Sequence, residues 1–172
     1  MTPQHIFLVG PMGAGKSTIG KHLADLLDLP FVDVDTEIES RAGADIQWIF
    51  DMEGEQGFRD RECKVLLDLA GNAQPTVIAT GGGIVLRDEN RAVLMRGGRV
   101  IYLSATAEQL FERTRRDKSR PLLQVDDRRT VIAKLVEIRD PLYKQVADLI
   151  FPSGSMQPNK LAKKLAEALS AL

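Results

Sequence analysis

The stretch LVGPMGAGKSTIGKHL, residues 8–23, is the part of the chain that decides the fold. It satisfies the pattern G-x-x-x-x-G-K-[ST] at Gly10, Gly15, Lys16 and Ser17. Glycines let successive backbone N–H groups point inward around phosphate oxygens, and a helix that begins here directs its positive dipole end at the same anion. The lysine is expected to reach the β- and γ-phosphates, and the serine hydroxyl to ligate Mg²⁺. An apolar run precedes the pattern and a helical pattern follows it, so the stretch predicts a phosphate loop that binds a nucleoside triphosphate.

Short apolar runs alternate with helical patterns along the rest of the chain. Runs rich in β-branched or aromatic residues predict strands at residues 5–10, 31–35, 76–80, 99–103 and 148–151. Their near-continuous apolarity is typical of strands covered on both faces, as in a parallel sheet. The alternation predicts a three-layer α/β fold with right-handed crossovers, but it does not fix the order of the strands. Pro141 is expected to kink or restart the helix predicted before the last strand.

The composition describes an ordinary globular protein of one domain, residues 1–172. Hydrophobic residues make up 44% of the chain, and the net charge of -1 gives no global field that favours nucleic acid or an anionic membrane. Cys63 is the single cysteine and has no partner within the chain, which fits a reducing cytoplasm. The first apolar run is too short for a signal peptide or a membrane span. We therefore expect a cytoplasmic protein, and a monomer because no long apolar patch is evident.

Two segments are additions to the simple alternation of strands and helices. Residues 36–72 are predicted to form a mostly helical insertion, and residues 116–127 are polar, basic and irregular. Insertions near the carboxyl ends of parallel strands are where α/β proteins bind ligands, so the two segments are candidate substrate and lid elements. The basic residues within 113–120 could instead bind nucleic acid. That reading is disfavoured because no aromatic residues interleave with them and two aspartates follow.

Phosphate-loop proteins include switches, motors and phosphotransferases, and the motifs of a guanine-nucleotide switch are missing. The tetrapeptide NKLA at residues 159–162 has alanine where a guanine-reading N-K-x-D motif needs aspartate. The tetrapeptide DMEG at residues 51–54 has the form D-x-x-G but lies in a helical pattern. Both matches are interpreted as accidental, which favours a phosphotransferase.

Charged residues that suit a phosphoryl acceptor follow the second predicted strand. Asp33 and Asp35 are expected on one side of a strand end, where one can hold Mg²⁺ through water and the other can orient or deprotonate a hydroxyl. Arg59 and Arg61 lie beside Glu62, and an arginine held by a glutamate is a good fork for a ligand carboxylate. The alternatives are a solvated strand end and ordinary surface ion pairs.

Three consecutive glycines, residues 81–83, directly follow the third predicted strand. Such a run suits a place where a ligand must approach the backbone closely, whereas a plain turn needs one glycine. Arg120, in the irregular basic segment, could cover the phosphates during transfer.

The motifs GPMGAGKST, DVDTEIE, GEQGFRDRE, ATGGG, RPLL and RDPLY occur in an order and spacing that resemble the shikimate kinase family. The resemblance covers the chain from about residue 5 to the C-terminal helix. It implies a P-loop NTPase fold like that of nucleoside monophosphate kinases, with a five-stranded parallel sheet in the order 2-3-1-4-5. It also implies a substrate-binding subdomain at about residues 33–60 and a lid at about residues 112–125. The implied reaction transfers the γ-phosphoryl group of ATP to the 3-hydroxyl of shikimate, in aromatic amino-acid biosynthesis.

The resemblance further implies roles for individual residues on the nucleotide side of the site. ATP would be bound by Gly13, Ala14, Gly15, Lys16, Ser17, Thr18, Arg120 and Gln157, the last of these near the adenine. Mg²⁺ would be held by Ser17 and, through water, by Asp33. Lys16 and Arg120 would stabilise charge on the transferring phosphoryl group.

On the acceptor side, the resemblance implies that Asp35 binds the ring hydroxyls of shikimate and can serve as the base. Arg59 and Arg139 would clamp the shikimate carboxylate, with Glu62 positioning them. Gly81, Gly82 and Gly83 would bring backbone groups to the substrate. A gluconate kinase-like enzyme and a catalytically silent nucleotide binder remain the alternative hypotheses.

Overall fold

The structure, a computed structural model, describes residues 4–115, 121–123, 125–154 and 156–172. Within these residues the chain forms one parallel sheet of five strands: β1 (His5–Val9), β2 (Phe31–Asp33), β3 (Val77–Ala79), β4 (Gly98–Ser104) and β5 (Leu149–Pro152). The strands lie in the order β2-β3-β1-β4-β5. The predicted α/β class is therefore confirmed, and so is the strand order that the resemblance implied.

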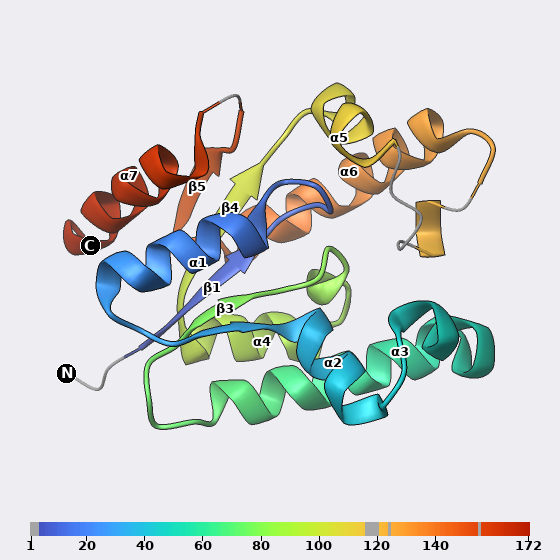
Figure 1. Cartoon of the computed structure of the whole chain (residues 1–172), viewed down its shortest axis with the longest axis horizontal. Coiled ribbons are helices and arrows are strands. Elements are labelled where there is room, and N and C mark those ends of the chain that lie inside the picture. Colours follow the sequence, from blue (N-terminus) through green and yellow to red (C-terminus); the bar gives the residue numbers. More distant parts are fainter. Residues whose placement is uncertain (1–3, 116–120, 124, 155) are drawn as a thin grey trace.

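Helices cover both faces of this sheet (Figure 1). One face carries α1 (Lys16–Leu27) and α7 (Pro158–Ser170), and the other carries α3 (Ile46–Ala70), α4 (Asp88–Gly97) and α6 (Arg128–Val146). The remaining helical elements are α2 (Val34–Ala42), α5 (Ala107–Thr114) and two 3-10 turns, η1 (Ile84–Leu86) and η2 (Pro121–Leu123). Across the described residues, no helix combines the length and the apolar composition that crossing a membrane requires.

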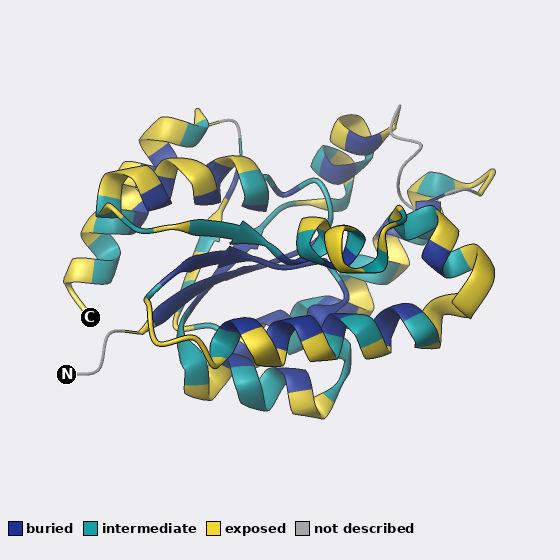
Figure 2. Cartoon of the chain, turned by 60° about the horizontal axis from the view of Figure 1, so that its bottom comes forward, coloured by how far each residue is buried: buried dark blue, intermediate teal, exposed yellow. Residues whose placement is uncertain are grey.

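The central strand β1 explains why the strands are apolar without interruption. Phe7 and Val9 belong to the core under α3, α4 and α6, whereas Ile6 and Leu8 belong to the core under α1 and α7. Successive side chains of a strand point to opposite faces, so a strand covered on both faces needs apolar residues at every position. Figure 2 shows the resulting buried strands between helices whose outer surfaces are exposed.

The strand β2 is shorter than the sequence predicted, and the cause is a helix cap. The prediction of a strand to residue 35 is wrong, because β2 ends at Asp33 and α2 begins at Val34. Asp33 is the N-cap of α2, and its Oδ1 accepts a hydrogen bond from the backbone N–H of Thr36 at 3.1 Å. Aspartate is a favoured N-cap because it satisfies a backbone donor that the helix leaves unpaired. Asp35 consequently lies in the first turn of a helix rather than on a strand.

The helical insertion that was predicted for residues 36–72 is confirmed as α2 and α3. Helix α3 contains one residue with non-helical backbone angles, Gly54, with φ 74° and ψ 179°. The part of α3 after Gly54 carries Arg59 and Glu62, and it packs through Val65, Leu66 and Leu69 against the sheet. The helix that packs against the sheet therefore also positions Arg59 and Glu62 of the motif GEQGFRDRE.

Helix α6 runs from Arg128 to Val146 and continues through Pro141. The predicted restart at this proline is wrong. Residues on both sides of Pro141 are buried, including Arg139 and Tyr143. Tertiary packing on both sides of a proline can offset the one helical hydrogen bond that proline cannot make.

Candidate active site

A cavity of about 550 Å³ opens where β1, β2 and β3 end. It is lined by the phosphate loop, by the segments that follow β2 and β3, and by residues of α3, α5 and α6. The predicted site residues that line it are Gly13, Gly15, Lys16, Ser17, Thr18, Asp33, Asp35, Arg59, Gly81, Gly82, Gly83 and Arg139. Because carboxyl ends of parallel strands meet at one edge, residues far apart in the sequence share one cavity of ligand-binding size.

Two of the predicted site residues that the structure describes, Ala14 and Gln157, do not line this cavity. Ala14 is 1% exposed and packs in the core beside α1, while its backbone N–H donates to the carbonyl of Pro11 at 3.2 Å. Gln157 is exposed and occupies the N-cap position of α7. Arg120 lies outside the described residues.

The phosphate loop has backbone angles that favour glycine. Gly13 and Gly15 have φ values of 84° and 94°, in the left-handed region that residues with a Cβ rarely adopt. Helix α1 begins immediately afterwards, at Lys16, as the sequence predicted. Among the described residues, no side chain caps the first turn of α1. Its N-terminal N–H groups therefore suit an anion, which the helix dipole also favours.

Lys16 is folded into the phosphate loop. Its Nζ donates to the carbonyl oxygens of Gly10 at 2.5 Å and Pro11 at 2.9 Å, and the residue is 8% exposed. The loop therefore holds an ammonium group against the cavity that the residue lines. A buried cation in this position can stabilise negative charge that develops on a phosphoryl group.

Ser17 and Asp33 contact each other at the floor of the cavity. The Ser17 hydroxyl donates to Oδ2 of Asp33, while Oδ1 of the same aspartate caps α2. The described residues contain no cluster of three or more His, Cys, Asp or Glu side chains that could hold a metal ion. A hydroxyl and one carboxylate match a Mg²⁺ ion that takes most of its ligands from phosphates and water.

The acceptor side of the cavity contains three buried charged groups, Arg59, Glu62 and Arg139. Nη1 of Arg59 donates to Oε1 of Glu62 at 2.9 Å, and the Glu62 side chain is 0% exposed. Nε of Arg59 and Oε2 of Glu62 have no hydrogen-bond partner among the described residues. This buried group holds two guanidinium groups and one carboxylate, and the exposed Glu55 also pairs with Nη2 of Arg59 at 3.4 Å. The group therefore suits one anionic substituent of a ligand.

The pKa shifts of these residues follow from their burial. Burial raises the pKa of Glu62, and the nearby positive charge of Arg59 opposes this effect. Burial also lowers the pKa of Arg139, as does the charge of Arg59, against an opposing effect of Tyr143. A bound anion would relieve the repulsion between the two guanidinium groups.

The glycine triplet is required by contacts rather than by backbone angles, since none of its three residues has a positive φ. A Cβ at Gly83 would lie 2.4 Å from three guanidinium atoms of Arg59. A Cβ at Gly81 would lie 2.9 Å from Oδ1 of Asp35 and 3.1 Å from Oε2 of Glu62. The absence of side chains here lets the charged groups lie directly against the backbone that follows β3.

Replacing Gly83 by alanine is expected to raise the KM for the acceptor by about 10–100-fold, because the methyl group displaces the Arg59 guanidinium and loses a charge-assisted hydrogen bond. The φ of -95° allows alanine, so the effect isolates the steric contact. Steady-state kinetics measure it. Gly71→Ala is the matched control, because its Cβ would make only ordinary contacts and its φ is -78°. Equal KM values in the two variants would contradict this account.

Arg61 and Arg113 differ from what the sequence suggested. Arg61 forms a two-bond ion pair with Glu53, at 2.8 Å for each bond, and is not part of the buried group. Arg113, which the sequence analysis placed only in the implied lid and in the disfavoured basic patch, lines the cavity. It donates to the carbonyl of Gly13 at 3.0 Å and also contacts residues 153–154. No local signal distinguishes Arg113 from its basic neighbours, because its partners lie 40 and 100 residues away.

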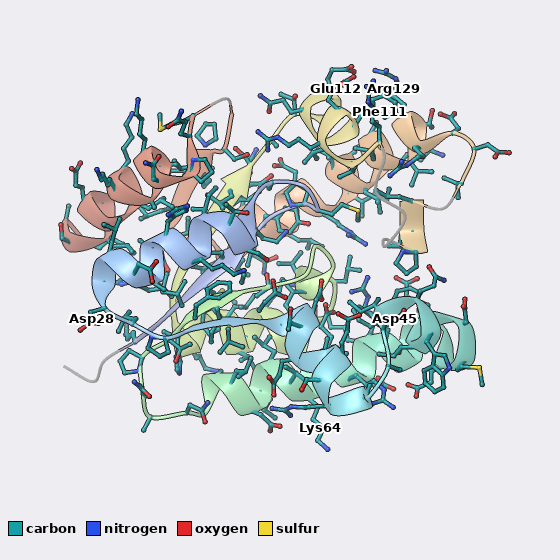
Figure 3. The ribbon with its side chains drawn as sticks, viewed as in Figure 1. Asp28, Asp45, Lys64, Phe111, Glu112 and Arg129 are labelled. Carbon is teal, nitrogen blue, oxygen red and sulfur yellow. The ribbon has the colours of Figure 1, made fainter. Side chains whose placement is uncertain are left out.

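The helices that flank the candidate lid are tied to each other. Arg129 on α6 lies over the Phe111 ring of α5, with 4.1 Å between guanidinium carbon and ring centroid, and it pairs with Glu108 (Figure 3). Arg128 donates to the carbonyl oxygens of Thr114 and Arg115 at the end of α5. These contacts therefore hold helices α5 and α6 together.

The fold, the phosphate loop and a cavity lined by buried charged groups are those of a P-loop phosphotransferase that acts on a small molecule. The sequence profile of the family described as shikimate kinase matches residues 12–170. A shikimate kinase of Histophilus somni (strain 2336) is 51% identical over 98% of this chain and 97% of its own length. A second, from Pasteurella multocida (strain Pm70), is 52% identical with the same coverage.

Among solved structures, the shikimate kinase from Acinetobacter baumannii in complex with shikimate superposes with a TM-score of 0.96. It is 46% identical, and the match covers 99% of this chain and 94% of that chain. The chain belongs to the shikimate kinase family and is an ATP-dependent kinase.

Proposed function

We propose that this chain transfers the γ-phosphoryl group of ATP to the 3-hydroxyl of shikimate, giving shikimate 3-phosphate in chorismate and aromatic amino-acid biosynthesis. The observation that carries the proposal is that one cavity joins a phosphate loop to a buried group of two arginines and one glutamate. Shikimate is a small molecule with one carboxylate and three hydroxyls, so it matches this cavity in charge and in hydrogen bonding. Family membership supports the proposal, and the solved relative is described in complex with shikimate.

On the nucleotide side, residues 13–18 bind the phosphates through backbone N–H groups and through the Lys16 ammonium. Ser17 and Asp33, which already contact each other, are the residues that hold Mg²⁺. Mg²⁺, when bound, neutralises charge on the β- and γ-phosphate oxygens. Gln157 borders the adenine, and Arg120 covers the phosphates from the lid at residues 112–125. Closure of that lid excludes water, which suppresses ATP hydrolysis.

On the acceptor side, Arg59 and Arg139 bind the shikimate carboxylate and Glu62 holds Arg59 in place. The Asp35 carboxylate binds the ring hydroxyls and accepts the proton of the 3-hydroxyl as the oxygen attacks phosphorus. The substrate-binding subdomain extends over about residues 33–60. The net charge of -1 supports a small-molecule partner rather than nucleic acid or membrane, and the single cysteine supports a cytoplasmic location. A monomer is proposed because the sequence has no long apolar patch.

Release of ADP from Mg·ATP in a coupled assay tests the proposal, with shikimate, gluconate or no acceptor present. Strong stimulation by shikimate alone is the expected result. Stimulation by gluconate in place of shikimate would overturn the acceptor while leaving the phosphate loop intact. No stimulation by either would favour a protein that binds nucleotide without transferring phosphate.

A further inference from the structure

Tyr143 is a buried tyrosine whose hydroxyl points at the active site rather than at the core. It lies on α6, one turn after Arg139, and it is 1% exposed. Its hydroxyl donates a hydrogen bond to the carbonyl oxygen of Gly82, the middle residue of the glycine triplet. The bond joins residues 61 positions apart in the chain, so the sequence gives no sign of it.

The same hydroxyl also faces the guanidinium of Arg139. Tyr143 raises the pKa of Arg139 against the effect of burial, so the two side chains interact electrostatically. A Cβ at Gly82 would lie 3.3 Å from Nη1 of Arg139 and 3.7 Å from Oη of Tyr143. Both polar groups therefore lie close to the backbone of Gly82. A guanidinium can only donate hydrogen bonds. The Tyr143 O–H donates to the Gly82 carbonyl, so it is the lone pairs of the same oxygen that can face the Arg139 guanidinium.

A second tyrosine holds the Tyr143 ring in place. The rings of Tyr102 and Tyr143 lie 4.9 Å apart at an angle of 34°. The Tyr102 hydroxyl donates to Oδ1 of Asp140 at 2.6 Å, and Oδ2 of Asp140 pairs with Lys144 at 2.9 Å. Burial raises the pKa of Tyr143 to about 12, so its hydroxyl keeps its proton at neutral pH and remains a donor. The ring cannot turn away without breaking these contacts.

We propose that Tyr143 is a positioning residue, which holds the Arg139 guanidinium and the Gly82 backbone in the geometry that receives the carboxylate of the acceptor. The inference rests on the proposed function, since it needs an anionic acceptor at Arg139. Phenylalanine would fill the same volume in the core, so the hydroxyl itself carries the role. Its loss removes the hydrogen bond to the Gly82 carbonyl and an oxygen that faces Arg139, in a site where the guanidinium already lies near the positive charge of Arg59.

The replacement Tyr143→Phe is expected to raise the KM for shikimate about tenfold, with the KM for ATP changed by less than about twofold, because only the carboxylate grip is loosened. Tyr102→Phe is the matched control, since it removes one phenol hydroxyl from the same ring pair without touching Gly82 or Arg139. It is expected to leave both KM values near those of the wild type. Similar changes in both variants, or a change in both KM values of Tyr143→Phe, would overturn the proposal in favour of a structural role.

A double-mutant cycle with Arg139→Ala separates action through Arg139 from general damage. Arg139→Ala alone is expected to raise the KM for shikimate and to spare that for ATP, and adding Tyr143→Phe should then change little. Additive effects would overturn the proposal. If the wild-type enzyme shows no shikimate-dependent ADP release, the proposed function fails instead, before the variants are compared.

A measurement that leaves Tyr143 itself unsubstituted guards against a Tyr143→Phe variant that does not fold. The chain contains two tyrosines, so uniform 3-fluorotyrosine labelling gives two ¹⁹F resonances, which Tyr102→Phe assigns. Shikimate is expected to shift the Tyr143 resonance, and ATP alone to leave it in place. If shikimate does not change the chemical shift of the Tyr143 resonance, the proposal is wrong.

Discussion

Replacing Asp35 by asparagine is expected to lower kcat by about 10²–10⁴-fold at saturating ATP and shikimate, which is the contribution typical of a general base. The aspartate lies in the first turn of α2 and lines the cavity. Its Oδ1 lies close to the backbone at Gly81. Asparagine has nearly the same shape, so it preserves this packing but cannot accept the proton of the acceptor hydroxyl. Single-turnover kinetics measure the effect on the chemical step without interference from product release.

Asp33→Asn is the matched control, because the two aspartates are adjacent in the cavity but contact different groups. Asp33 caps α2 and accepts a hydrogen bond from Ser17, so its loss is expected to act through Mg²⁺. Activity of Asp33→Asn should recover in part at high Mg²⁺ concentration, whereas that of Asp35→Asn should not. A kcat for Asp35→Asn near that of the wild type would show that phosphoryl transfer here needs no base, which a loose transition state can allow.

The phosphate loop could be predicted in detail because its information is local. The spacing of its glycines, lysine and serine, between a strand and a helix, specifies both the backbone angles and the ligand. The start of α1 at Lys16 and the left-handed angles of Gly13 and Gly15 follow directly from that pattern. The insertion at residues 36–72 was predicted only as mostly helical, and the non-helical backbone of Gly54 within α3 was not predicted.

The prediction for residues 31–35 failed because two local signals compete there. FVDVD alternates as a strand should, but Asp33 followed three residues later by Thr36 is also a helix cap. The cap prevails, since the bond between these residues begins α2 directly at the end of β2. Asp35 therefore lies on a helix instead of a strand, but it still lines the cavity. The predicted and the observed structure both put it at the carboxyl end of β2.

The contacts that complete the acceptor side could not be predicted, because each joins distant segments. The bond from Tyr143 to Gly82 and the fit of Arg59 against Gly83 depend on how α6 and α3 pack on the sheet. The glycine triplet was interpreted as a place of close approach to the backbone. The structure brings charged side chains there, which the run of glycines alone could not specify.

Replacing Lys16 by methionine is expected to lower kcat by about 10²–10³-fold, the usual cost of removing one group that stabilises charge in a transition state. Methionine keeps an unbranched side chain of similar length and removes only the ammonium group. The wild-type ammonium is bound to the carbonyls of Gly10 and Pro11 within the loop. Their loss of a partner should also reduce the free energy of unfolding by about 1–3 kcal/mol. Steady-state kinetics and chemical denaturation measure the two effects separately.

Lys21→Met is the control, since Lys21 lies on the same helix and is exposed, with its Nζ 6.0 Å from the centroid of the Phe31 ring. It removes an equal charge from α1, so a general effect of net charge would appear in both variants. An activity of Lys16→Met equal to that of Lys21→Met would mean that the backbone N–H groups and the helix dipole suffice for the phosphates. In that case the ammonium would serve only to hold the carbonyls of the loop together, and its effect would be confined to stability.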